Sequence, residues 1–214
     1  MASGRLRPSS TGYDDFSEAN GSGRAIRKEA AALKKVIEVM AEDRLALDVN
    51  AASRLIGKFK LRSGQVSDEY FDKYRFESDP ELLRRVARRM LPLIPQGAEI
   101  LAGLELGGVP IATAMSLECG LATVFVRKKA KAYGTCQAVE GGEISGRKVV
   151  IVEDVITTGG AVLDAAAMIH AAGGIVVAVV CAIWRGEGAP RINDLPDIPV
   201  FAALTKAELS RYSN

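Results

Sequence analysis

The chain has 214 residues, of which 48% are hydrophobic and 25% are charged. This length suits one sizeable α/β domain with a small appendage, and it argues against two full domains. The 28 basic and 26 acidic residues give a formal net charge of +2. That balance excludes the strong overall field of a nucleic-acid coat or a membrane-surface protein, so any anion must bind at a local site.

The cysteine pattern argues against a disulfide scaffold and against a metal site. Cys119, Cys136 and Cys181 are widely spaced, form no CxxC pair and are accompanied by a single histidine, His170. The N-terminus has no continuous apolar export segment, and "GGIVVAVVCAIW" is too short to span a bilayer. We expect a cytoplasmic protein with reduced thiols that binds neither membranes nor nucleic acid.

The N-terminal third is expected to contain a tail, two helices and an irregular region. Residues 1–25 mix Gly, Ser, Pro and charges without periodicity, which predicts a disordered tail, and residues 26–214 then form a single domain. Residues 26–42 have apolar side chains at helical spacing. The next region predicts a short helix and an alternating segment around a Ser-Gly turn. "DPELLRRVARRMLPLI" predicts a helix that Asp79 caps.

From residue 99 onward, strand-like and helix-like segments alternate. The strand-like segments are "EILAGLEL", "ATVFVRK", "KVVIVEDV", "IVVAVVCAIWR" and "PVFAALT", and the helix-like ones are "VPIATAMSLECG" and "GAVLDAAAMIHAAG". Nearly continuous Val and Ile runs are typical of strands that are buried on both faces. The alternation therefore predicts an α/β fold with a parallel sheet flanked by helices.

The stretch "VVIVEDVITTGGAV", residues 149–162, ends a buried strand with two carboxylates and then turns through threonines and glycines into a helix. In open parallel sheets, ligands bind outside the carboxyl ends of the strands. Glu153 and Asp154 can accept hydrogen bonds from the two vicinal hydroxyls of a ribose, while free amides at the helix start bind its phosphate. The stretch therefore predicts a ribose 5-phosphate site. One alternative is a strand that ends in two solvated acids. The other is the acidic strand of a nucleotide hydrolase, but that fold needs a GxxxxGK[ST] loop upstream, and the sequence has none.

This stretch resembles the phosphoribosyl-pyrophosphate (PRPP) motif of the type I phosphoribosyltransferases. With "KLRSGQVSDEYFDKYRFESDPELL", "LAGLELGGVPIA", "FVRKKAKAYGTCQAVEGG" and "VCAIWRGEG", the chain resembles the orotate phosphoribosyltransferase family over residues 30–210. The resemblance implies a Rossmann-like core with a small N-terminal hood from residues 43–78, and a homodimer. It implies that PRPP and orotate give orotidine 5′-monophosphate and pyrophosphate, in UMP synthesis. It also implies Mg²⁺ that PRPP carries in, near Glu153 and Asp154 and without direct protein ligands.

The resemblance assigns catalytic roles to Lys131, Glu153 and Asp154, with Lys131 acting in the partner subunit's site. The residues that it assigns to PRPP are Gly107, Arg127, Lys128, Lys131, Tyr133, Glu153, Asp154, Val155, Ile156, Thr157, Thr158, Gly159, Gly160 and Ala161. The basic run 127–131 would neutralise the departing pyrophosphate, although a solvated basic loop is the alternative. Many bacterial relatives have Tyr-Lys-Gly where this chain has Leu106, Gly107 and Gly108, and many have histidine in place of Tyr133.

The residues that the resemblance assigns to orotate are Arg62, Tyr70, Phe71, Thr157 and Arg185. Tyr70 and Phe71 fit either stacking on the pyrimidine ring or packing within the hood. Arg62 stands where the family commonly has lysine, and Trp184 stands where it commonly has aspartate.

Two other functions remain open from the sequence. One is a phosphoribosyltransferase for a purine or another pyrimidine. The other is a PRPP-binding regulator without catalysis, although such proteins usually add a basic nucleic-acid-binding surface that is not evident here. The sequence does not support the catalytic triad of a hydrolase, because the only histidine, His170, lies in a predicted helix.

Overall fold

The computed structural model describes residues 44–61, 64–129 and 137–212. These belong to one compact unit, Glu42–Asn214. The expected tail over residues 1–25 and the expected helix over residues 26–42 lie outside the described residues. Within the described part of the chain, no helix is long and apolar enough to cross a membrane.

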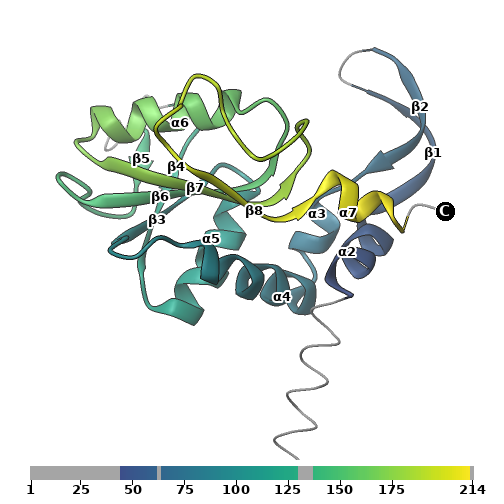
Figure 1. Ribbon diagram of the computed structural model, residues 1–214, viewed down its shortest axis with the longest axis horizontal. Helices are drawn as coiled ribbons and strands as arrows, with labels where there is room; N and C mark the ends of the chain where they lie inside the picture. Colours follow the sequence, from purple (N-terminus) through teal and green to yellow (C-terminus); the bar gives the residue numbers. More distant parts are fainter. Residues whose placement is uncertain (1–43, 62–63, 130–136, 213–214) are drawn as a thin grey trace, which may run out of the picture. The chain divides into compact units, whose positions relative to one another are not determined.

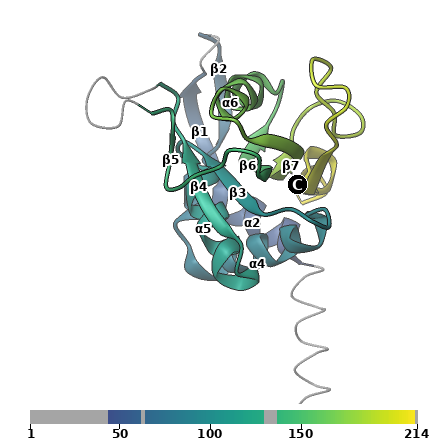
Figure 2. The same cartoon turned by 90° about the vertical axis from the view of Figure 1, so that its left-hand side faces the viewer.

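A six-stranded sheet forms the centre of this unit, with the order β5-β4-β3-β6-β7-β8. Figure 2 shows its strands from β5 to β7. Its strands are β3 (Ile100–Leu104), β4 (Ala122–Val126), β5 (Val139–Glu140), β6 (Lys148–Ile156), β7 (Ile175–Trp184) and β8 (Val200–Thr205). All pairings are parallel except that of β5 with β4. The prediction of a parallel sheet is confirmed, and β5 is an antiparallel addition at its edge.

Helices cover both faces of the sheet (Figure 1). α6 (Gly160–Ala171) lies over one face, and α4 (Pro80–Met90) with α5 (Gly108–Cys119) covers the other. Successive strand residues point to opposite faces, so Val150 joins the core under α4 and α5 while Val149 joins the core under α6. Because neither face meets water, the strands are rich in Val and Ile throughout.

The N-terminus of α4 confirms the predicted cap. Asp79 Oδ1 accepts hydrogen bonds from the backbone N–H groups of Glu81 at 2.9 Å and Leu82 at 3.0 Å, and Pro80 opens the helix. A short 3₁₀ turn, η1 (Leu91–Leu93), follows α4 and leads toward β3.

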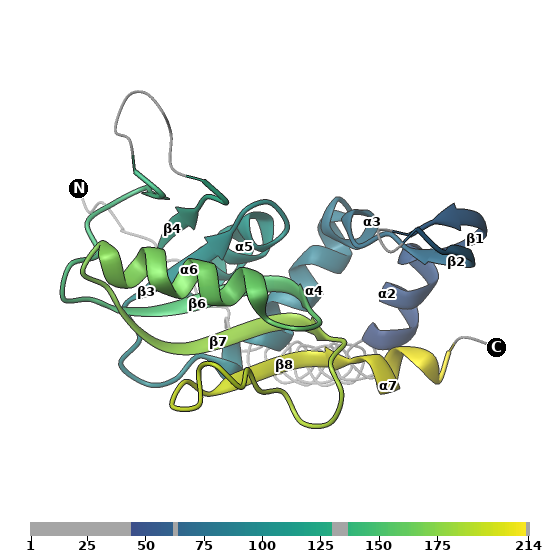
Figure 3. The same cartoon turned by 90° about the horizontal axis from the view of Figure 1, so that it is seen from above.

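The region before α4 forms the small N-terminal hood (Figure 3). It comprises α2 (Leu45–Ser53), the antiparallel pair β1 (Arg54–Lys60) and β2 (Val66–Phe71), and α3 (Tyr74–Glu77), with the C-terminal helix α7 (Lys206–Ser210) beside α2. Leu45, Val49 and Phe76 are buried in the core shared with α4. The hood is therefore anchored by apolar packing while its hairpin extends outward.

The sheet has a topological switch point between β3 and β6. β3 leads through α5 to β4 on one side, whereas β6 leads through α6 to β7 on the other. A crevice for ligands forms outside the carboxyl ends of the strands at such a point. β6 pairs with β3 only as far as Val152 but pairs with β7 as far as Ile156. Both acids therefore lie within the last residues of β6, beyond its pairing with β3 and at the strand end that the sequence predicts.

Candidate active site

Glu153 and Asp154 lie at the switch point with their carboxyl groups almost completely removed from solvent, at 8% and 0% exposure. The backbone N–H of Asp154 donates to Glu153 Oε1 at 3.0 Å, and the backbone N–H of Val155 donates to Asp154 Oδ1. These local hydrogen bonds fix both carboxyl groups at the end of β6. The predicted acid pair is therefore held at the end of β6, where Glu153 lines the hollow before α6; its binding of hydroxyl groups stays a prediction.

Two residues from the hood join the acid pair. Lys73, which precedes α3, forms an ion pair with Asp154 Oδ2. Glu77, at the end of α3, is 7% exposed and lies beside the same carboxylate. We call Lys73, Glu77, Glu153 and Asp154 the acid cluster. Neither hood residue was predicted, because their contact with β6 depends on where the hood packs and no local pattern reports it.

Burial and the single ammonium group decide the charges in the acid cluster. Burial, together with the neighbouring Asp154, raises the pKa of Glu153 to about 9 and that of Glu77 to about 8. Burial also acts to raise the pKa of Asp154, but hydrogen bonding with Glu153 and the ion pair with Lys73 outweigh it and lower that pKa. Burial acts to lower the pKa of Lys73, but the interaction with Asp154 outweighs burial and raises that pKa. At neutral pH the cluster thus holds one carboxylate, one ammonium and two protonated acids.

The loop between β3 and α5 passes directly over the acid cluster. A Cβ atom on Gly107 would overlap the Asp154 carboxylate and lie 2.9 Å from Glu77 Oε1. A side chain at position 107 would clash with these acids, which favours glycine there. Gly107 is therefore placed at the predicted site, where its backbone is close to the acids.

The loop between β6 and α6 forms a small hollow. Glu153 and the residues from Val155 to Val162 line a space of about 330 Å³. Gly159 precedes the helix with a φ of 86°, in the left-handed region that favours glycine, and no side chain of the described residues caps α6. Free amides and the dipole at this N-terminus suit an anion, and Thr157 and Thr158 are exposed beside them. The predicted glycine turn and helix start are therefore present, and their binding of phosphate stays a prediction.

Arg127 and Lys128 follow β4 and reach the same end of the sheet. They border a hollow of about 370 Å³ together with Ala161 and other residues of α6. The backbone N–H of Lys128 donates to Glu105 Oε2 at 3.0 Å, which ties this basic pair to the loop before α5. Lys131 and Tyr133, the remaining predictions on this segment, lie outside the described residues.

A larger hollow, of about 690 Å³, lies between the hood hairpin and the ends of β6 and β7. Its lining includes Tyr70, Phe71, Thr157 and Arg185, as well as Arg54 and Lys206, which the sequence analysis missed. The Arg185 guanidinium stands 5.4 Å from the Phe71 ring centroid, and Tyr70 packs against Phe59 at 5.5 Å. Tyr70 therefore both lines the hollow and packs within the hood. Arg62 lies outside the described residues.

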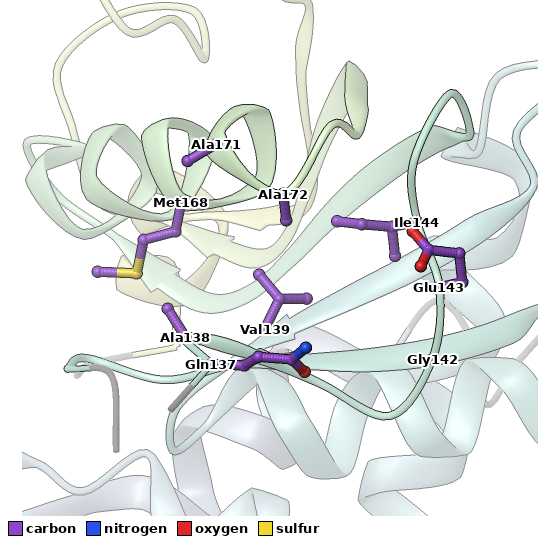
Figure 4. A pocket seen from close by; sticks show the side chains of 9 residues that line it. All are labelled: Gln137, Ala138, Val139, Gly142, Glu143, Ile144, Met168, Ala171 and Ala172. Carbon is purple, nitrogen blue, oxygen red and sulfur yellow. The ribbon is translucent and has the colours of Figure 1, made fainter. Parts of the chain in front are cut away.

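A further hollow, of about 410 Å³, lies beside α6 near the short strand β5 (Figure 4). Its lining is mostly apolar, with Val139, Ile144 and Met168, and contains none of the predicted site residues. The chemistry is therefore assigned to the three hollows around the switch point.

Comparison with known proteins identifies the family. The model of the phosphoribosyl transferase domain matches residues 78–203. An orotate phosphoribosyltransferase of Nocardioides is 55% identical, covering 77% of this chain and 92% of the relative. A crystal structure of Mycobacterium tuberculosis orotate phosphoribosyltransferase with Fe(III) dicitrate has a TM-score of 0.69 and 31% identity, covering 78% of this chain and 98% of that one. The structure of the same mycobacterial enzyme with PRPP has a TM-score of 0.67 and 28% identity, covering 79% and 98%. The chain therefore belongs to the orotate phosphoribosyltransferase family.

Proposed function

We propose that the protein transfers the 5-phosphoribosyl group of PRPP to N1 of orotate, giving orotidine 5′-monophosphate and pyrophosphate in the formation of UMP. The observation that carries this proposal is the acid pair on β6, which leads directly into an uncapped helix N-terminus at the switch point of the sheet. The 55% identical relative named for this activity supports orotate as the base.

Glu153 and Asp154 bind the ribose hydroxyls of PRPP, and residues Thr157–Ala161 bind its 5-phosphate through hydroxyls and backbone amides. Val155 and Ile156 continue β6 into this loop and set its distance from the acids. The ribose C1 develops oxocarbenium character as pyrophosphate leaves, and the Asp154 carboxylate stabilises that charge. The ionised ring nitrogen of orotate is the nucleophile, so catalysis consists of positioning and charge stabilisation.

The basic segment after β4 neutralises the departing pyrophosphate. Arg127 and Lys128 border the hollow beside α6, and the Gly107 backbone borders the acid cluster. We assign Lys131 and Tyr133 to the same task and propose a homodimer in which Lys131 serves the partner subunit's site. Free Cys119 and Cys181 are consistent with our proposal that this dimer is cytoplasmic.

The hollow beneath the hood binds orotate. A planar ring fits against Phe71 and Tyr70, while the Arg185 guanidinium can form a paired, charge-assisted contact with the orotate carboxylate. Thr157 lies at the boundary of this hollow and the phosphate loop, and so it contacts both substrates. We assign Arg62 to this pocket as well.

The donor set of the site fits Mg²⁺ that enters with PRPP. Among the described residues, no group of three acidic, histidine or cysteine side chains is arranged to hold a metal, and Asp154 is engaged with Lys73 and Val155. Carboxyl oxygens are nevertheless hard donors that suit Mg²⁺, so Glu153 and Asp154 can face a diphosphate-bound ion without being its principal ligands. Bound Mg²⁺ would neutralise charge on the diphosphate.

The test is the fall in orotate absorbance when PRPP and Mg²⁺ are added to the purified protein. We expect turnover with orotate and none with adenine, guanine, hypoxanthine or uracil under the same conditions. Turnover of another base alone would contradict the assignment of orotate. PRPP binding without pyrophosphate release from any base would contradict catalysis itself.

A further inference from the structure

Lys73 forms an ion pair with the Asp154 carboxylate, which a ribose hydroxyl of PRPP needs as its hydrogen-bond acceptor under the proposed function. Its ammonium pairs with Asp154 Oδ2, and the Asp154 side chain has 0% exposure while that of Lys73 has 33%. The same Nζ atom lies 5.3 Å from the centroid of the Tyr74 ring. Lys73 thus joins the acid cluster from the solvent side, with its charged end next to the crevice.

The chemistry of PRPP places its diphosphate close to this ammonium. Under the proposed function, Asp154 accepts a hydrogen bond from a ribose hydroxyl, and that hydroxyl competes with Lys73 for the carboxylate. The diphosphate stands on C1, the carbon next to the one that bears the 2-hydroxyl. When the ribose hydroxyls meet Asp154, the ammonium that pairs with Asp154 is therefore close to the carbon that bears the diphosphate.

Other features of the site leave the hood side of the diphosphate to Lys73. In the described part of the chain, it is the one cation that an ion pair joins to the acid cluster. Gly107 brings no side chain to the cluster, and a Cβ there would overlap Asp154. Arg127 and Lys128 border a different hollow, beside α6. A diphosphate that leaves next to Asp154 would therefore lack a cation on the hood side without Lys73.

We propose that Lys73 is a PRPP-binding residue that exchanges Asp154 for the substrate's diphosphate when PRPP binds. This inference rests on the proposed function. Before PRPP binds, Lys73 keeps the buried Asp154 ionised. Once PRPP is bound, Asp154 holds the ribose and Lys73 holds the leaving group. The hood thereby contributes to the binding of PRPP as well as to that of the base.

The experiment compares two ligands that differ only by the diphosphate. Binding of PRPP and of ribose 5-phosphate, each with Mg²⁺, is measured by titration calorimetry for the wild type, Lys73→Gln and Lys73→Arg. Glutamine can still donate a hydrogen bond to Asp154 but carries no charge. The matched control is Arg75→Gln, because Arg75 is an exposed cation in α3, the helix that Lys73 precedes.

We expect Lys73→Gln to weaken PRPP binding by about tenfold or more, and to change ribose 5-phosphate binding by less than about twofold. Lys73→Arg should recover most of the loss, and Arg75→Gln should bind both ligands as the wild type does. An equal loss for both ligands would show that Lys73 acts only through Asp154, which overturns the proposal. Unchanged PRPP affinity would overturn it as well.

A measurement on the wild type covers the case in which a Lys73 variant does not fold. Acetic anhydride should modify Lys73 more slowly in the PRPP complex than in the ribose 5-phosphate complex, as read by peptide mass spectrometry. Equal rates in the two complexes would contradict the proposal. A wild type that binds PRPP and shows this difference, yet makes no nucleotide from orotate, would refute the proposed function and leave the role of Lys73 standing.

Discussion

At the scale of single residues, Asp154 combines full burial with the negative charge of the acid cluster. Asp154→Asn keeps the size of the side chain but loses the charge that pairs with Lys73 and stabilises the developing cation. We expect kcat/KM for PRPP to fall on the order of a hundredfold or more. The orotate absorbance assay measures this loss, and Asp194→Asn, at an exposed position, is the control. A folded Asp154→Asn protein with wild-type kinetics would contradict this role.

Glu77 should make the stability of the ligand-free protein depend on pH. Its pKa is raised from 4.5 to about 8, so the folded state keeps a proton that the unfolded chain has lost. Its contribution to stability is complete below pH 4.5 and is lost as the pH rises through about 8. Glu77→Gln should flatten the fall in unfolding free energy from about pH 5 to about pH 8, by up to about 1 kcal/mol per pH unit.

Urea unfolding at several pH values, without substrate or Mg²⁺, measures this effect. Glu77→Gln should retain part of the slope, because Glu153 also has a raised pKa, of about 9. The expected difference is therefore one of slope rather than of overall stability. Parallel curves for the wild type and Glu77→Gln would mean that Glu77 does not hold a proton in the folded protein.

At the scale of elements, the loop between β3 and α5 needs a glycine so that it can cross the acid cluster. Gly107→Ala would push a methyl group against the Asp154 carboxylate, and it should destabilise the protein by about 1–3 kcal/mol. It should also lower kcat/KM, because Asp154 must move away from the ribose. Gly142→Ala is the control, since nothing lies within 4 Å of a Cβ atom there. Equal effects of the two changes on unfolding and kinetics would contradict this account.

The elements that could be predicted from the sequence are those set by local patterns. β6 and α6 follow from a Val and Ile run, two acids and a glycine turn, and the cap of α4 follows from Asp79 and Pro80. The ion pair of Lys73 with Asp154 could not be predicted, because it joins the hood to the sheet through packing of α3. For the same reason, the sequence placed the acids at a strand end without showing that β6 pairs with β3 only as far as Val152.

At the scale of the whole molecule, the site draws on segments that are far apart in the chain. The hood supplies Phe71 and Lys73, the end of β6 supplies the acids, and the end of β7 supplies Arg185. A site assembled in this way depends on several packed elements, so the proposed catalysis would require the hood and the sheet together. The proposed dimer would extend the same principle by adding Lys131 from a second subunit.

This arrangement predicts complementation between two inactive variants. If Lys131 acts in the partner's site, a mixed dimer of Lys131→Ala and Asp154→Asn subunits has one site with Asp154 and Lys131 both intact. Co-expression with random pairing should then restore roughly a quarter of wild-type activity, since half of the dimers are mixed and each has one of two sites working. If Lys131 acts within its own subunit, each site of the mixed dimer carries one defect, and the activity stays at the level of the separate variants.

Differently tagged subunits allow the mixed dimer to be purified and its single working site to be counted by PRPP-dependent turnover. A monomer by light scattering, or a mixed dimer as inactive as its parents, would contradict action in the partner's site and leave the chemistry of the acid pair unaffected.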